Sequence, residues 1–282
     1  MSQTLFALSP LDGRYASKTT PLRNFFSEAA LIQARVQIEL YYLIALAGAK
    51  IITPFTAKQK QSIKKLFKPL TSAQLNQVKK FDNKTHHDVK AIEYFLQTQF
   101  KKHGLNSYIQ FIHFGLTSAD INNLAYRLLI IQALNQIIWP ELLKILTNLA
   151  EFSNQHAATA ILARTHGQPA IPTTFGKEIS VFLKRLSKPL QKLEHWQTDG
   201  KLGGAVGSFQ ALNFILPTVN WPRFAKNFVE ELGFHYLTNT TQINPNDDLV
   251  ELFTIFKHIN LILLELNQDL WRYISDDWLC QQ

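Results

Sequence analysis

The chain has 282 residues, a formal net charge of +8 and a single cysteine, Cys280. This length is enough for a large core in one or two domains, and a 46% hydrophobic content excludes disorder over most of the chain. One cysteine excludes a disulfide framework and a cysteine-based metal site, and it fits a reducing compartment. Met1–Pro10 lacks a basic region and an apolar core, so we expect no signal peptide. No uncharged apolar run is long enough for a membrane span, and we predict a cytoplasmic protein.

Much of the positive charge lies between Lys58 and Lys102. A nucleic-acid surface is one interpretation of these lysines. They are scattered around helices and accompany no recognition motif, so a solvated face is the better interpretation. We therefore expect no nucleic-acid partner, although a basic protein attracts small anionic substrates.

Helical periodicity dominates the first half of the chain. Apolar residues recur every three or four positions over 27–48, 56–69 and 89–104, and Ser27 and Thr56 precede the first two stretches as N-caps. Three helices are therefore predicted here.

The second half predicts longer helices. One begins after Thr117 and continues to about residue 149, kinked and not ended by Pro140. Others are predicted over 172–197, over 221–233 and from 247 to the C-terminal end.

No convincing strand pattern appears, so the sequence predicts an all-α chain. Helices are short before about residue 111 and long after it. We therefore predict a small N-terminal helical domain over 1–110 and an incomplete bundle of long helices over 111–282. The glycine-rich segment 201–207 predicts a tight loop that approaches some other group closely.

His166 is the most informative candidate for chemistry. It lies within 164–169, predicted to be a loop between two long helices, where Gly167 would allow close backbone approach. Thr165 and Gln168 offer polar atoms on either side. An imidazole in such a loop suits proton transfer to a leaving group, although a histidine that only satisfies nearby carbonyls is the commoner case.

Two further groups suit the binding of anions. Arg14 and Tyr15 follow a turn, and their guanidinium and phenol can bind phosphate or carboxylate oxygens. His86, His87 and Asp88 precede a predicted helix, whose N-terminus favours an anion. A surface turn and a helix cap are the alternatives. Adjacent histidines cannot readily share one ion, so we expect no metal site.

Two weaker candidates offer hydroxyls and an amide. Thr117 and Ser118 begin a predicted helix, and capping alone would explain them. Gln242 offers a carboxamide before the last predicted helix.

Taken together, these segments resemble one family. Asp-Gly-Arg-Tyr at 12–15, His-Asp-Val at 87–89, Leu-Thr-Ser at 116–118, Arg-Thr-His-Gly-Gln-Pro at 164–169 and Gly-Ala-Val-Gly at 204–207 follow one another as in bacterial adenylosuccinate lyases. The segment around His166 is shared with the wider fumarase and aspartase superfamily. The resemblance implies an all-α homotetramer whose active sites combine three subunits, and it implies no cofactor.

The implied reaction is β-elimination of fumarate from an anionic nucleotide. The substrates would be adenylosuccinate, which gives AMP, and the succinylated aminoimidazole carboxamide ribotide of purine biosynthesis. The resemblance implies a general acid, His166, and a second catalytic residue, His87, that orients the reacting centre. It implies substrate contacts for Arg14, Tyr15, His86, His87, Asp88, Thr117, Ser118, Thr165 and Gln242.

One departure from the family concerns the catalytic base. The family's mobile serine loop would follow the last predicted helix, and the sequence ends at Gln282 before it. Loss of a general base costs about two to four orders of magnitude in rate, so we expect no fumarate release from these 282 residues unaided. Two interpretations stay open: part of a working lyase, or a catalytically inactive chain that keeps the scaffold and binds intact lyase subunits.

Overall fold

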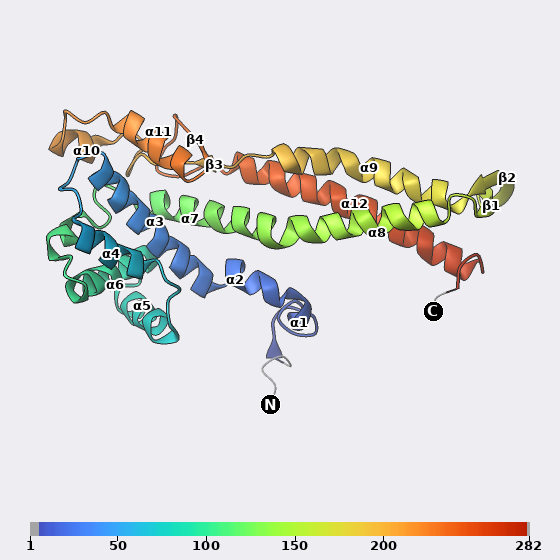
Figure 1. Cartoon of the computed structure of the whole chain (residues 1–282), viewed down its shortest axis with the longest axis horizontal. Helices are drawn as coiled ribbons and strands as arrows, with labels where there is room; N and C mark the ends of the chain where they lie inside the picture. The colour runs from blue at the N-terminus through green and yellow to red at the C-terminus, as the bar shows by residue number, and fades with distance from the viewer. Residues whose placement is uncertain (1–5, 281–282) are drawn as a thin grey trace. The chain divides into compact units, whose positions relative to one another are not determined.

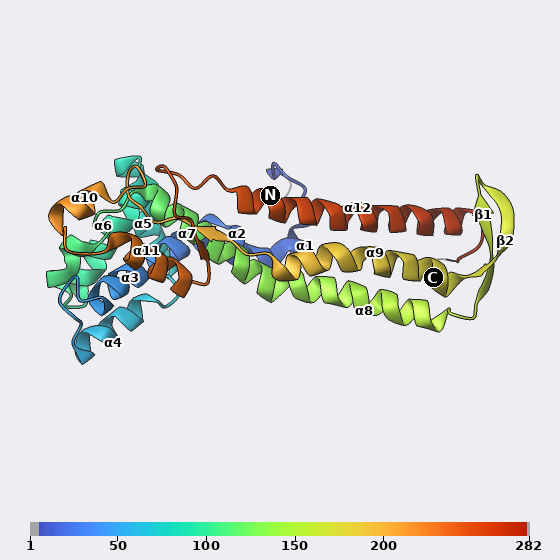
Figure 2. The ribbon, with the colours of Figure 1, turned by 90° about the horizontal axis from the view of Figure 1, so that it is seen from above.

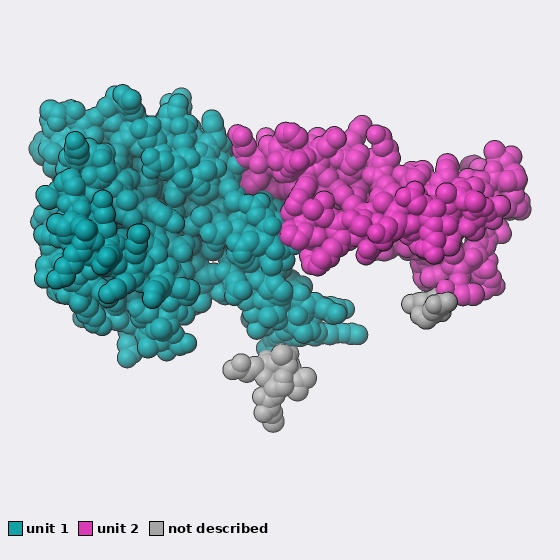
Figure 3. Space-filling model, viewed as in Figure 1, with its two compact units in different colours: residues 1–137, 198–245 teal, residues 138–197, 246–282 magenta. Residues whose placement is uncertain are grey.

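The computed structural model describes residues 6–280, and helices dominate it (Figure 1), which confirms the predicted all-α class. Met1–Pro10, for which we expect no signal peptide, lies partly outside the described residues. The chain forms two compact units: unit 1 comprises 1–137 and 198–245, and unit 2 comprises 138–197 and 246–282 (Figure 3). The division into domains at residue 110 stays a prediction.

Unit 1 is built around one long helix, α3. Residues on several sides of α3 are fully buried, among them Ile38, Leu40 and Tyr42. The helical elements of unit 1 are α1 (Ala16–Thr19), η2 (Thr20–Leu22), α2 (Arg23–Phe26), α3 (Glu28–Gly48), α4 (Ala57–Leu66), α5 (Ser72–Thr85), α6 (Asp88–Lys102), η3 (Asn106–Phe111), α7 (Ser118–Ala133), α10 (Gln210–Ile215) and α11 (Trp221–Glu231).

Side-chain caps fix where these helices begin. Ser27 accepts a hydrogen bond from the Ala30 N–H at 3.2 Å, and Thr56 forms the predicted capping box. Helix α5 also has a capping box, at Thr71, but the sequence did not predict this helix. Its apolar pattern is weak because it buries only Val78.

Unit 2 contains three long helices that lie side by side, α8 (Trp139–Gln155), α9 (Phe175–His195) and α12 (Asp247–Ser275) (Figures 1 and 2). The chain passes from α7 to α8 through a π-helical stretch, Leu134–Ile138. Pro140 lies in the first turn of α8, where proline is tolerated because backbone N–H groups in the first turn need no partner within the helix. The predicted continuation of the helix past Pro140 is therefore confirmed.

The prediction of no strand pairing was wrong. Strands β1 (Ala160–Thr165) and β2 (Gln168–Thr174) form an antiparallel hairpin, and β3 (Asp199–Gly200) pairs in parallel with β4 (His235–Tyr236). Strand β2 contains two prolines, which an edge strand tolerates but which are uncommon in strands. The sequence of β2 therefore does not show a typical strand pattern. The helix predicted from residue 172 accordingly begins at Phe175.

Helix α12 carries two apolar stripes. One is buried and contains Leu252, Ile259, Ile262 and Leu266. The second stripe is exposed within the chain and contains Val250, Phe253, Leu261, Leu264 and Trp271.

Two helical stretches, Ala16–Gly48 and Ser118–Gln155, have the length and hydropathy of a membrane span. The window in the first is 56% buried, as in the core helix of a soluble protein, while that in the second is 17% buried. Ser118–Gln155 also carries the buried charged residues Asp120 and Arg127. Length and composition alone are weak evidence for a membrane, and we keep the expectation of a soluble chain.

Candidate functional site

Four of the predicted residues lie close together in unit 1. His87 is the N-cap of α6, and its Nδ1 accepts the Lys90 N–H at 3.1 Å. The neutral ring therefore carries its proton on Nε2, which lies 3.4 Å from the Ser118 Oγ. Gln242 donates from Nε2 to the Thr117 Oγ1 at 3.3 Å. We call these residues, His87, Ser118, Thr117 and Gln242, the polar row.

Asp88 belongs to a structural ion pair. One carboxylate oxygen accepts the Val89 N–H at 2.8 Å, and the other accepts from the buried guanidinium of Arg35. Arg35 also donates to Asn122 Oδ1 at 2.8 Å. Asp88 therefore links α6 to α3 from the first turn of α6, and its contact with substrate stays a prediction.

A buried ion pair fixes the start of α7 behind the polar row. Asp120 and Lys201 are fully buried, with 2.6 Å between Oδ1 and Nζ. The Asp120 carboxylate also accepts the N–H groups of Thr117, Gly203 and Gly204 at 2.9, 3.0 and 3.1 Å. Sequence reasoning missed this pair because its members are 81 residues apart.

The glycine-rich segment 201–207 makes the predicted close approach, and the structure shows that its neighbour is another stretch of backbone. A Cβ placed on Gly207 would lie 2.1 Å from the Thr240 carbonyl oxygen and 2.7 Å from that of Thr241. These carbonyls immediately precede Gln242. The absence of a side chain at Gly207 therefore sets the position of the Gln242 segment.

His113 forms a second charged cluster in unit 1. Its Nδ1 lies 2.6 Å from Glu39 Oε1, its backbone N–H donates to Glu39 Oε2 at 3.0 Å, and its Nε2 lies 3.9 Å from Glu93. Burial lowers the pKa of His113, but the hydrogen bond and charge of Glu39, together with Glu93, outweigh burial and raise this pKa above 6.5. His113 was not among the predicted site residues. Its place four residues before Thr117 in the sequence was the available signal.

Three histidines have left-handed backbone conformations, His86, His113 and His166, with φ of 51°, 59° and 52°. Such conformations in residues other than glycine are uncommon and often lie at functional sites. His86 is the C-cap of α5, and its side chain is exposed and makes no hydrogen bond to the described residues. Its contact with substrate stays a prediction.

His166 lies at the tip of the hairpin in unit 2, not in a simple loop between helices. Thr165 pairs with Gln168, so His166 and Gly167 form a two-residue turn in which both φ values are positive. A Cβ placed on Gly167 would have no atom within 4 Å, so the expected close backbone approach at this residue was wrong. Glycine is favoured here because it adopts the positive φ of 75° that the turn requires. The imidazole is exposed. His166 and Thr165 thus belong to unit 2, and the polar row belongs to unit 1.

Arg14 and Tyr15 are exposed and contact each other. The Tyr15 N–H donates to the Pro10 carbonyl at 2.8 Å, and the Arg14 guanidinium lies 5.8 Å from the centre of the Tyr15 ring. No contact among the described residues connects this pair to the polar row. Its role in substrate binding stays a prediction.

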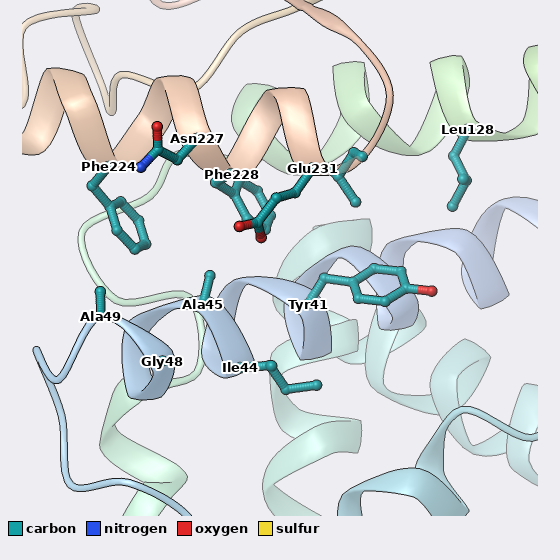
Figure 4. A pocket seen from close by; sticks show the side chains of 11 residues that line it. Tyr41, Ile44, Ala45, Gly48, Ala49, Leu128, Phe224, Asn227, Phe228 and Glu231 are labelled. Atoms are coloured by element: carbon teal, nitrogen blue, oxygen red, sulfur yellow. The ribbon is translucent and has the colours of Figure 1, made fainter.

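A large hollow in unit 1 contains none of these residues. It has a volume of about 670 Å³ and lies between α3 and α11, where Tyr41, Ile44, Phe224 and Phe228 line it (Figure 4). Among the described residues, no three His, Cys, Asp or Glu side chains are grouped so that they could hold a metal ion.

Comparison with known proteins places the chain in a family. The family model described as lyase matches residues 13–280. The chain belongs to this lyase family.

Among curated proteins, it is similar to the adenylosuccinate lyase of Legionella pneumophila subsp. pneumophila strain Philadelphia 1, with 42% identity over 275 residues. It is also similar to the adenylosuccinate lyase of Escherichia coli K12, with 36% identity over 276 residues. Each match covers 96% of this chain and 60% of the relative, so the chain spans about 60% of their length. The resemblance to adenylosuccinate lyases is confirmed.

Solved structures agree on the fold. A fumarate lyase from Mesorhizobium sp. BNC1 matches with a TM-score of 0.76 and 20% identity, over 91% of this chain and 57% of that chain. The 3-carboxy-cis,cis-muconate lactonizing enzyme of Pseudomonas putida matches with a TM-score of 0.70 and 22% identity, over 90% and 56%. At these identities the likeness supports the fold alone.

Proposed function

We propose that the chain supplies substrate-binding groups and the proton donor of an adenylosuccinate lyase. The substrates would be adenylosuccinate and the succinylated aminoimidazole carboxamide ribotide, each losing fumarate by β-elimination. The polar row is the observation that carries this proposal, because it places two hydroxyls, an imidazole N–H and a carboxamide at the N-termini of α6 and α7. Helix N-termini favour the carboxylate and phosphate groups of such substrates.

The elimination requires donors for a developing dianion and an acid for the departing nitrogen. In this proposal Ser118, Thr117 and the Nε2–H of His87 bind the succinyl carboxylates, and His87 orients the reacting centre. His166 donates the proton to the leaving amine. Gln242, Thr165, Asp88, His86 and the Arg14–Tyr15 pair bind the rest of the nucleotide. Acid–base chemistry of the protein's own side chains carries the reaction, and we propose no cofactor.

Substrate binding is tested by Ser118→Ala, with adenylosuccinate titrated by calorimetry. Loss of one hydrogen bond to a charged group is expected to weaken binding about tenfold. Ser72→Ala is the matched control, because Ser72 is likewise the first residue of a capped helix, α5. Equal affinity in the Ser118 variant, or no saturable binding by the unmodified chain, would contradict the proposed site.

The acid role is tested by His166→Asn. Asparagine tolerates the left-handed conformation of this turn, so the variant removes the proton donor and keeps the hairpin. The chain is mixed with intact adenylosuccinate lyase subunits, and fumarate release above that of the intact subunits alone is measured. This additional release is expected to fall in kcat by about two to four orders of magnitude with little change in KM. A change confined to KM would contradict the acid role.

We also propose a cytoplasmic homotetramer. The exposed apolar stripe of α12 supports association, because contiguous exposed apolar side chains mark interaction sites in soluble proteins.

A further inference from the structure

A second, smaller hollow in unit 1 has the features of an anion site. Its volume is about 200 Å³, and it lies where α4 ends, α5 begins and α6 ends. It shares no residue with the polar row or with the His113 cluster. We propose that this hollow binds a small organic carboxylate, a role independent of the proposed lyase activity.

The charged residues around the hollow are basic. Lys65 and Lys68 line it on one side, and His103, the C-cap of α6, lines it on another. In the part of the chain that the structure describes, no Asp or Glu lines the hollow, and neither lysine has a carboxylate partner. Lys65 also lies near the negative end of α4, which favours its charge but leaves its ammonium N–H groups available.

A glutamine amide that can bind a ligand also lines the hollow. Gln99 is 5% exposed, its carboxamide makes no hydrogen bond to any described residue, and its polar atoms are not among the fully buried ones. The carboxamide can therefore hydrogen-bond a ligand or water in the hollow. Leu70, another lining residue, donates its N–H to Gln33 Oε1 at 2.8 Å, and Gln33 Nε2 is buried without a partner.

Size and lining favour an organic anion over inorganic phosphate. A volume of about 200 Å³ is large enough for a four-carbon dicarboxylate. Leu66, Phe95 and Leu96 supply an apolar floor for a carbon skeleton. The lysines and the Gln99 amide can then donate to carboxylate oxygens. Phosphate has no apolar part to place on this floor.

The test uses fumarate as the probe, titrated into the purified chain by calorimetry and ligand-observed NMR. Saturable binding is expected, and Lys65→Gln with Lys68→Gln should weaken it at least tenfold, as should Gln99→Leu. Lys58→Gln with Lys80→Gln is the control, because it removes two exposed lysines, from α4 and α5, that do not line the hollow. Unchanged melting temperatures check that each variant is folded. No saturable binding, or affinity unchanged in the hollow's variants, overturns the proposal.

Two further measurements distinguish the hollow from the polar row and a carboxylate ligand from phosphate. Ser118→Ala should leave fumarate binding at the hollow intact, and complete loss of binding in that variant would assign the anion to the polar row and overturn the proposal. Inorganic phosphate should compete weakly. Phosphate binding as tight as fumarate would overturn the carboxylate class.

Discussion

At the scale of single residues, the buried Asp120–Lys201 pair offers the sharpest prediction for stability. Lys201→Met leaves the Asp120 charge buried and unpaired, and breaking a buried pair typically costs about 3–5 kcal/mol. Urea unfolding measures the loss. Lys144→Met is the control, because Lys144 and Glu141 also lie 2.6 Å apart but are exposed to solvent. Surface pairs contribute little, so equal losses in the two variants would contradict the assigned burial.

His113 gives the folded state a dependence on pH. Its pKa is raised above the unfolded value of 6.5, so the folded state binds the proton more tightly than the unfolded chain. The resulting stabilisation is fully present below about pH 6.5 and is lost as pH rises through the folded pKa.

His113→Asn is the comparison, because asparagine also tolerates the left-handed backbone at this position. The difference in unfolding free energy between the unmodified chain and this variant should be largest near pH 6 and shrink on the alkaline side. A difference that grows with pH would contradict the Glu39 contact as the dominant interaction.

Which single residues could be predicted depended on the range of their contacts. The caps Ser27 and Thr56 were predicted because a cap acts within three residues of itself. Asp120 and Lys201 were not, because a buried ion pair between distant segments leaves no local pattern. Of the candidate residues, His87, Ser118, Thr117 and Gln242 lie together in the structure, whereas no contact among the described residues connects Arg14 and Tyr15 to them.

At the scale of elements, the hairpin that presents His166 depends on its second turn residue. Gly167 has a φ of 75°, a conformation that costs an L-residue about 1–2 kcal/mol. Gly167→Ala should therefore destabilise the hairpin by about that amount, measured as faster amide hydrogen exchange in β1 and β2. Ala170→Gly, an exposed change within β2, is the control for general loosening of the strand. Unchanged exchange in the alanine variant would contradict the two-residue turn.

Elements with many apolar residues and clear boundary signals were predicted, and weakly patterned ones were missed. Helix α3 is rich in buried apolar residues over its 21 positions and lies between the Ser27 cap and Gly48, so both its ends were predicted closely. Helix α5 buries one apolar residue, and β2 contains two prolines and is largely exposed, so neither shows the period that identifies such elements. Local capping and turn geometry, not burial, determine these two elements.

At the scale of the whole molecule, the exposed stripe of α12 should govern self-association. Phe253 and Leu264 are 62% and 53% exposed within the chain, although the same helix buries Leu252 and Leu266 on its other stripe. An apolar surface of this kind is stabilised when a second copy covers it. Phe253→Glu with Leu264→Lys should therefore shift the chain toward monomer in analytical ultracentrifugation, with the helical circular-dichroism signal retained. Glu251→Lys is the control, since it changes an exposed charge of the same helix without removing apolar surface. An unchanged sedimentation coefficient in the apolar variant would show that this stripe does not form the interface, and the homotetramer proposal would then need another surface.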